Sequence, residues 1–220
     1  MNERTAKTEG RAAWLGAGVL YDEAWTLQKR LAAFRSEERI PDTLLLLEHA
    51  PVYTAGRRAV AEHVIGALRA PLVETDRGGQ TTYHGPGQLV GYPIISLREH
   101  GLGPRSYVDA LEGAVIAALA RFGVRAWCEP GLTAVWTAHG KIAAFGVKVS
   151  RGVTLHGFAL NVSTDLAYYA PIIPCGIADR PVASAASILG EAPSMTAMRS
   201  AVTQELGTRL GIAWREVPQA

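Results

Sequence analysis

The sequence predicts an α+β fold, a single domain in which helices flank a largely antiparallel or mixed β-sheet. Helix-like and strand-like patterns follow one another as helix, strands, helix, strands, helix, and not in the strict alternation typical of a doubly wound parallel sheet. The 220 residues, 48% of them hydrophobic, are sufficient for a sizeable core. We expect residues 16–215 to form this domain and residues 1–15 to be a loosely held tail.

Three helices are predicted from apolar residues at helical spacing. The first carries the stripe Tyr21, Ala24, Gln28, Leu31 and Phe34. The second covers "RSYVDALEGAVIAALARFGV", residues 105–124, with Ser106 and Asp109 as a capping pair and Gly123 as a stop. The third runs from about Ser194 to Leu210 and carries the stripe Met198, Val202, Leu206 and Leu210.

Five runs between the helices are typical of strands: "DTLLLLEHA", "QLVGYPIISL", "LTAVWT", "KIAAFGVKVS" and "TLHGFALNV". Most glycines should lie where strands turn back, since glycine tolerates positive φ and close backbone approach.

Charge and composition exclude several classes of protein. A net charge of +2 without a lysine- or arginine-dense run argues against a nucleic-acid partner. No apolar run approaches the roughly 20 residues of a membrane helix, and the polar N-terminus has no signal-peptide core. Two distant cysteines make no disulfide framework, so we expect a cytoplasmic protein. The local charges are either scattered and solvated or a small basic rim for an acidic partner: Arg57, Arg58, Arg77, Lys148 and Arg151.

We expect no metal and no cofactor. The six histidines show no H-x-x-x-H spacing, and the sequence has no C-x-x-C, Walker loop, G-x-S-x-G elbow or dinucleotide fingerprint. His84 in "TYHGPG" and His156 in "TLHGFALN" are each a ligand contact or a turn histidine bonded to backbone, and a Cys-His dyad using one of them stays open.

Lys141 and Cys175 are candidates for acid–base and nucleophilic chemistry. Strand alternation puts Lys141 on one face with Ala143 and Phe145, where lost hydration would disfavour its ammonium form; the alternative is a strand-end lysine that reaches water. Cys175 lies in a stiff Pro-Cys-Gly turn that could display a thiol, although many free cysteines are simply small buried side chains. A nearby lysine could take the thiol proton. We expect Cys128 to be a buried structural residue.

Several segments together resemble the lipoyl (octanoyl) transferases of lipoate biosynthesis. They are "LLLLEHAPVYTAGRR", "RGGQTTYHGPGQLVGYPIISL", "GKIAAFGVKVSRGVTLHGFALNV" and "PCGI", and they cover roughly residues 44–178 in order. The resemblance implies a fold related to the lipoate and biotin protein ligases. It also implies an acyltransferase that moves an octanoyl group from acyl carrier protein to a lysine of a lipoyl domain through a cysteine thioester. The implied acceptors are the lipoyl domains of 2-oxoacid dehydrogenase complexes and the glycine cleavage H protein.

By the same resemblance, the acyl-accepting cysteine is Cys175 and the lysine that tunes it is Lys141. The implied acyl-substrate contacts are Arg77, Gly78, Gly79, Gln80, Thr81, Thr82, Tyr83, His84, Ala144, Phe145, Gly146, Gly157, Phe158 and Ala159. Phe145 stands where the family more usually has a smaller aliphatic residue, which implies a different tunnel shape. The Gly-rich stretch from residue 77 is then an ordered wall along an acyl chain, with Arg77 and His84 near the polar head of that chain.

Two alternatives remain at this point. An ATP-dependent lipoate or biotin ligase on the same fold would use the Gly-rich loop to hold an acyl-adenylate, but it needs no cysteine, and ligase-type SGGG or GRGRxG signatures are missing. A non-catalytic acyl or carrier-protein binder would keep the pocket without turnover.

Overall fold

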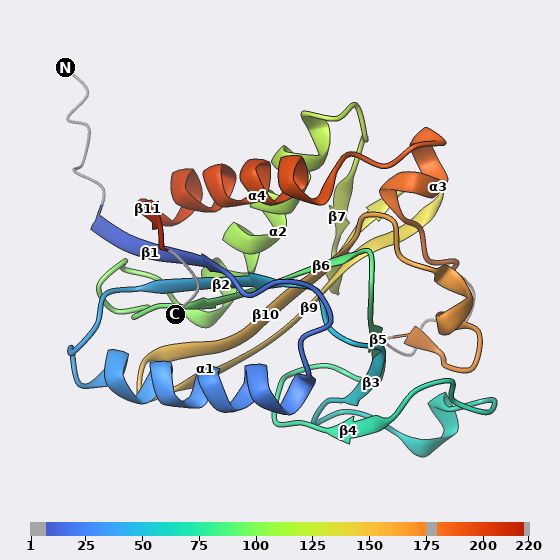
Figure 1. Ribbon diagram of the computed structural model, residues 1–220, viewed down its shortest axis with the longest axis horizontal. Helices are drawn as coiled ribbons and strands as arrows, with labels where there is room; N and C mark the ends of the chain where they lie inside the picture. Colours follow the sequence, from blue (N-terminus) through green and yellow to red (C-terminus); the bar gives the residue numbers. More distant parts are fainter. Residues whose placement is uncertain (1–7, 175–179, 218–220) are drawn as a thin grey trace.

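An eight-stranded mixed sheet forms the middle layer of the molecule (Figure 1). The computed structural model describes residues 8–174 and 180–217. The strand order is β11-β1-β2-β6-β10-β9-β8-β7. In chain order these strands are β1 (Thr8–Trp14), β2 (Thr43–Leu47), β6 (Gln88–Ile94), β7 (Trp127–Glu129), β8 (Leu132–Thr137), β9 (Gly140–Ser150), β10 (Val153–Asn161) and β11 (Ile212–Glu216). β1 is parallel to β11 and to β2, and the other neighbours are antiparallel, so the predicted mixed sheet is confirmed.

A second, three-stranded sheet lies beside the first, with the order β4-β3-β5. It consists of β3 (Val52–Ala55), β4 (Leu72–Glu74) and β5 (Thr82–His84). The short helices η1 (Ala61–His63) and η2 (Leu166–Tyr169) accompany it, and η2 packs on β5 through Tyr83 and Tyr169. The expected Gly-rich wall therefore contains a strand of its own, β5.

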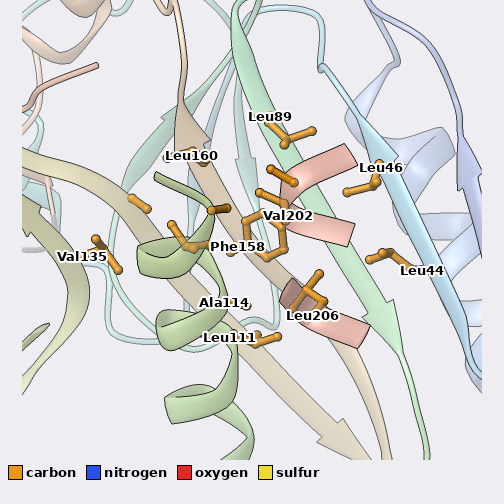
Figure 2. Close-up of a cluster of buried hydrophobic side chains, with 14 of the residues drawn as sticks. Leu44, Leu46, Leu89, Leu111, Ala114, Val135, Phe158, Leu160, Val202 and Leu206 are labelled. Atoms are coloured by element: carbon orange, nitrogen blue, oxygen red, sulfur yellow. The ribbon is translucent and has the colours of Figure 1, made fainter. Parts of the chain in front are cut away.

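Helices cover both faces of the large sheet, as Figure 1 shows: α2 (Pro104–Ala120) and α4 (Met195–Leu210) on one face, α1 (Tyr21–Ser36) on the other. A fourth helix, α3 (Ala185–Leu189), precedes α4. Figure 2 shows the main core, where Leu111 of α2 and Val202 of α4 meet strand residues such as Leu160. The three helices predicted from apolar spacing are confirmed.

The start of α2 differs from the prediction. Gly103 occupies the N-cap position, and the Ser106 hydroxyl accepts a hydrogen bond from the Gly103 N–H at 3.0 Å. Asp109 instead forms an i,i+4 ion pair with Arg105. Pro104 explains the shift, because proline is favoured in the first turn, where no N–H partner is needed. The N-cap of α2 is thus Gly103, three residues before the predicted cap Ser106.

The expected tail of residues 1–15 includes an ordered strand. Thr8–Trp14 is β1, which pairs with β2 on one side and with β11 on the other. The expectation was wrong for these residues because "TEGRAAW" has a polar first half and no clear alternation. Its order comes from pairing on both edges, which is a long-range effect that no local pattern records.

A β-bulge changes the face to which Lys141 belongs. Val135 of β8 pairs with Ala143 and Trp136 pairs with Lys141, so Ile142 is an extra residue in β9. Ile142 and Ala143 both pack in the main core. Strict alternation, which grouped Lys141 with Ala143, is therefore wrong at this position.

Candidate active site

A pocket opens between the large sheet, the start of α1 and the small sheet. It is bounded by Tyr21, Arg77, Gly79, Gln80, Thr82, His84, Tyr92, Ala144, Phe145, Gly146, His156, Gly157, Phe158 and Ala159. The space that these residues enclose is about 450 Å³, which includes open solvent at its mouth. Most of these residues were expected from the resemblance; Tyr21, Tyr92 and His156 were not.

Small residues at matched positions of β9 and β10 form the floor. Ala144 pairs with Ala159, and Gly146 pairs with Gly157. A Cβ atom on Gly157 would lie 2.1 Å from the Gly91 carbonyl oxygen, and one on Gly146 would lie 2.8 Å from the Gly78 carbonyl oxygen. Only glycine fits at either position, so the backbone itself closes this part of the pocket.

The Gly-rich segment supplies the opposite wall by strand alternation. Gln80, Thr82 and His84 line the pocket, whereas Tyr83 turns away and stacks on Tyr168 with ring centroids 4.6 Å apart. Thr81 is buried and does not line the pocket. Three residues expected as substrate contacts, Gly78, Thr81 and Tyr83, therefore support the wall from behind.

Two sets of contacts fix the turn at residues 77–79. The Gly78 N–H donates to the Val147 carbonyl at 3.0 Å, which docks the turn on β9. The buried Arg77 side chain donates to the Thr54 hydroxyl and to the Gln80 carbonyl at 2.7 and 2.8 Å. Arg77 thus joins β3 to the Gly-rich wall as well as lining the pocket.

Three buried histidines surround the pocket. His49 donates from Nδ1 to the Val19 carbonyl at 2.9 Å and accepts at Nε2 from the Tyr92 hydroxyl. Burial lowers the pKa of His49 to about 4. Burial, with help from nearby His49 and Arg77, also lowers the pKa of His84 far below its ordinary value. These rings are neutral at physiological pH, so they act there as fixed hydrogen-bonding groups.

His156 has an unusual backbone. Its φ of 58° lies in the left-handed region inside β10, and its N–H donates to the Gln28 side-chain oxygen at 2.8 Å. The ring donates from Nε2 to Asp76, which also pairs with Lys148 at 2.7 Å. Burial lowers the pKa of His156 despite that carboxylate. His156 is therefore held by its backbone and ring together, in a conformation that non-glycine residues adopt rarely.

Lys141 lies at the start of β9, three positions before Ala144, or roughly 10 Å in an extended strand. It is only 5% exposed. Its N–H donates to the Pro181 carbonyl at 3.0 Å, and its carbonyl accepts from the Ala183 N–H at 2.9 Å. The lysine backbone therefore anchors the segment that follows residues 175–179. Cys175 itself lies outside the described residues.

Cys128 is exposed on β7, which corrects the expectation of a buried thiol. β7 is three residues long and is the last strand at this end of the sheet, so within the described residues it has a strand neighbour on one side only. Partial burial of the thiol, together with Glu112, raises the pKa of Cys128 to about 11. A thiol with such a pKa is a poor nucleophile at neutral pH.

The expected basic rim is not one cluster. Lys148 is in the ion pair with Asp76, and Arg151 is in the turn between β9 and β10. Arg57 and Arg58 lie beside the Gly-rich wall, since their N–H groups donate to the Arg77 and Gly79 carbonyls. Of the five charges considered for the rim, these two exposed arginines are the candidates for a charged contact near the pocket.

Phe145 belongs mainly to the core. It packs in the main core cluster, and its ring centroid is 6.3 Å from that of Phe158. Both residues also border the pocket from the sheet. The larger side chain thus fills space under α2, which favours a role in core packing.

Two other kinds of site are absent from residues 8–174 and 180–217. There, no three His, Cys, Asp or Glu side chains are grouped as metal ligands. No helix in this part of the chain has the length and apolarity needed to span a membrane.

Comparisons with known proteins agree with the fold. Residues 20–207 match the lipoyl protein ligase A/B catalytic domain. The octanoyltransferase of Chloroflexus aurantiacus is 46% identical over 198 residues, covering 86% of this chain and 89% of that protein. The octanoyltransferase of Chloroflexus aggregans is 50% identical over 184 residues, covering 80% of this chain and 83% of that protein.

Solved structures share the fold at low identity. Lipoate-protein ligase A bound with ATP superposes with a TM-score of 0.75 at 20% identity, covering 97% of this chain and 90% of that one. Biotin protein ligase from Aquifex aeolicus gives a TM-score of 0.59 at 15% identity, covering 91% of this chain and 70% of that one. With 46–50% identity to octanoyltransferases over most of its length, the chain belongs to the lipoyl protein ligase A/B catalytic-domain family, as an enzyme of the octanoyltransferase group.

Proposed function

We propose that the enzyme transfers an octanoyl group from octanoyl-acyl carrier protein to the target lysine of a lipoyl domain, through a thioester on Cys175. The acceptors would be the lipoyl domains of 2-oxoacid dehydrogenase complexes and the glycine cleavage H protein. The chain's similarity to octanoyltransferases supports the acyl group. The carrier-protein donor and the cysteine intermediate are carried over from the motif "PCGI".

The first transfer loads the enzyme. Lys141, as the neutral amine, takes the proton of the Cys175 thiol, and the thiolate attacks the carbonyl carbon of the carrier-protein thioester. The tetrahedral oxyanion collapses, the bond to the pantetheine sulfur breaks, and that sulfur takes the proton from Lys141. One thioester is exchanged for another, so no ATP is needed.

The second transfer unloads it. The amine of the acceptor lysine attacks the Cys175 thioester, an amide forms, and the Cys175–acyl bond breaks. Lys141 removes the surplus proton from the attacking nitrogen and returns one to the thiolate. Amide formation from a thioester is downhill, which makes this step effectively irreversible.

The observation that carries this proposal is the pocket along β9 and β10, with Lys141 at the start of β9. Its floor of Ala144, Gly146, Gly157 and Ala159 carries no side chain larger than a methyl group, which suits an alkyl chain. Burying about six methylenes at about 0.8 kcal/mol each contributes about 5 kcal/mol to binding. One methylene more or less changes this by only about 1–3 kcal/mol, so chain-length preference should be incomplete.

The test is acylation followed by mass spectrometry. Incubation with octanoyl-acyl carrier protein should add one octanoyl group that hydroxylamine removes. Cys175→Ser should abolish the adduct and the transfer, and Lys141→Ala should slow both steps. Wild-type transfer rates in Cys175→Ser would refute the cysteine mechanism, and ATP-dependent use of free octanoate would identify a ligase instead.

A further inference from the structure

A continuous chain of hydrogen bonds runs behind the pocket from Arg77 to Ala183. Arg77 Nη2 lies 2.7 Å from Thr54 Oγ1, which lies 3.2 Å from His84 Nε2. His84 Nδ1 lies 2.8 Å from Gln88 Oε1. Gln88 Nε2 lies 2.9 Å from Asn161 Oδ1. Asn161 Nδ2 lies 3.1 Å from the Ala183 carbonyl oxygen.

Backbone carbonyls fix the direction of the amide bonds in this chain. Gln88 Nε2 also donates to the Tyr83 carbonyl at 3.1 Å, so its Oε1 must face His84. Asn161 must likewise present Nδ2 to the Ala183 carbonyl and Oδ1 to Gln88. A flip of either amide would set oxygen against a carbonyl oxygen. Each amide therefore has one orientation that satisfies all its partners.

The donor and acceptor roles of its neighbours also fix the tautomer of His84. Because Gln88 Oε1 can only accept, His84 carries its proton on Nδ1, and its Nε2 accepts from the Thr54 hydroxyl. Thr54 Oγ1 in turn accepts hydrogen bonds from Nε and Nη2 of Arg77. A protonated His84 would place a second N–H against a hydroxyl that already accepts from Arg77, so the chain requires the neutral ring.

The side chains in this chain of hydrogen bonds are shielded from water. Thr54 and Gln88 are fully buried, and Asn161 is 4% exposed. Neither Gln88 nor Asn161 borders the pocket. Removing one donor would leave a buried acceptor unsatisfied, which costs more than the bond itself contributes. Full satisfaction of such a network fixes a single arrangement of its members.

The chain of hydrogen bonds ends beside Lys141, the residue that we propose as the proton carrier in both transfers. The Ala183 carbonyl accepts a hydrogen bond from Asn161 Nδ2. The Ala183 N–H donates to the Lys141 carbonyl at 2.9 Å. The Lys141 N–H donates to Pro181. Asn161 therefore holds the short segment that pairs with Lys141, from the side of β10.

We propose that Asn161, oriented by Gln88, is a positioning residue for Lys141, acting through the backbone of Ala183. This inference rests on the proposed function, in which Lys141 carries the proton in both transfers. The residue sets where the lysine backbone lies relative to the acyl pocket, since His84 and Arg77 belong to that pocket and to the same chain. It neither binds the acyl chain nor enters the reaction.

The test is Asn161→Asp, which keeps the acceptor for Gln88 and loses the donor to Ala183 above the pKa of the new carboxyl. We expect kcat for octanoyl transfer to fall about tenfold or more at pH 8, with KM for octanoyl-acyl carrier protein within about twofold, because the pocket is intact. The matched control is Gln204→Glu, the same amide-to-acid change at a side chain whose contact is the exposed bond from Arg121. This control should leave both constants unchanged.

Acid rescue separates positioning from a general loss of structure. When the carboxyl introduced by Asn161→Asp is protonated, it regains an O–H that can donate to Ala183. The ratio of variant to wild-type kcat should therefore rise as the pH falls from about 8 to about 5.5. Asn161→Leu, which removes both bonds without adding a charge, should show the kcat loss and no rescue. It also covers the case in which the aspartate variant does not fold.

The outcomes are distinct. If wild-type enzyme forms no octanoyl product, the proposed function fails. If wild-type enzyme transfers octanoyl while Asn161→Asp and Asn161→Leu match Gln204→Glu in kcat, the positioning inference fails alone. A loss confined to KM, or a ratio that does not change with pH, also overturns it.

Discussion

The Tyr92 hydroxyl donates a 2.7 Å hydrogen bond to Nε2 of His49, and both side chains are buried on the pocket side of the sheet. The ring of His49 in turn lies 5.7 Å from that of His84. Buried neutral histidines should make the free energy of unfolding depend on pH.

Stability should therefore fall as the pH falls from about 6.5 towards 4. In the unfolded chain His49, His84 and His156 titrate near pH ~6.5, whereas in the fold the pKa of His49 is about 4 and those of the other two are lowered. Between these pH values the unfolded state binds more protons than the folded state. The free energy of unfolding therefore falls progressively as the pH is lowered through this window. Each histidine contributes up to about 1.4 kcal/mol per pH unit.

Urea unfolding at pH 7.5, 6.5 and 5.5 measures this effect. The expected result is a free energy of unfolding that falls mostly between pH 6.5 and 5.5, and that falls less steeply in His49→Gln, by up to about 1.4 kcal/mol per pH unit. His139→Gln, at an exposed histidine in the β8–β9 turn, is the control and should keep the wild-type slope. A free energy of unfolding that does not change with pH would contradict the prediction.

Gly157→Ala should damage the pocket floor. The new Cβ would lie 2.1 Å from the Gly91 carbonyl oxygen and 2.9 Å from Pro93 Cδ, both held in β6. Because backbone cannot give way as a flexible side chain does, β6 and β10 must separate, at a cost of about 1–3 kcal/mol.

Thermal unfolding and octanoyl transfer assays check this prediction together. Gly66→Ala is the matched control, since its Cβ would meet Pro171 Cβ at 3.4 Å, an ordinary contact. We expect a lower Tm and slower transfer for Gly157→Ala alone. Equal behaviour of the two variants would show that the floor tolerates a methyl group.

Asp42→Asn should destabilise the fold without touching the pocket. Asp42 is 3% exposed and accepts hydrogen bonds from Arg35 Nε at 2.8 Å and from the Ser96 N–H at 3.1 Å. Burial works against ionisation of Asp42, but bonds from His100 and Arg35 outweigh it, and the pKa of the carboxyl is lowered. Removing the charge leaves buried Arg35 partly uncompensated, which typically costs about 3–5 kcal/mol.

Chemical denaturation measures the loss, and transfer by the folded enzyme should be unchanged. The control is Glu37→Gln, which removes an exposed ion pair with Arg39 and should cost less than about 1 kcal/mol. A loss for Asp42→Asn no larger than that of the control would refute this account of the cluster.

Local patterns predicted the elements with a strong apolar run or stripe and missed strands that lack one. The stripe from Tyr21 to Phe34 and the run of four leucines in β2 are strong signals, and both elements formed. β1 and β11 were missed because each depends on a partner far away in the chain. The bulge at Ile142 was missed for the same reason, since it appears only in the register with β8.

Most residues that line the pocket lie in the segments that carried the family resemblance, whereas the network behind it was not anticipated. The Gly-rich motif identified Arg77 and His84, and strand alternation within it could have separated Thr82, which lines the pocket, from Tyr83, which does not. Gln88 and Asn161 have no local signal, because their roles arise from side chains that meet across β6 and β10. Tyr21 was assigned to a helix stripe and also borders the pocket from the first residue of α1.

The two cysteines should differ sharply in reactivity. Partial burial and the neighbouring Glu112 carboxyl raise the pKa of Cys128 to about 11, so well under 1% of it is thiolate at pH 7.5. If Lys141 activates Cys175 as proposed, iodoacetamide at that pH should alkylate Cys175 first, and prior octanoylation should block the reaction. Peptide mass spectrometry distinguishes the two sites. Cys128→Ser should keep the fast labelling and full transfer activity, while Cys175→Ser should lose both. Faster labelling at Cys128 would remove the grounds for treating Cys175 as the activated thiol.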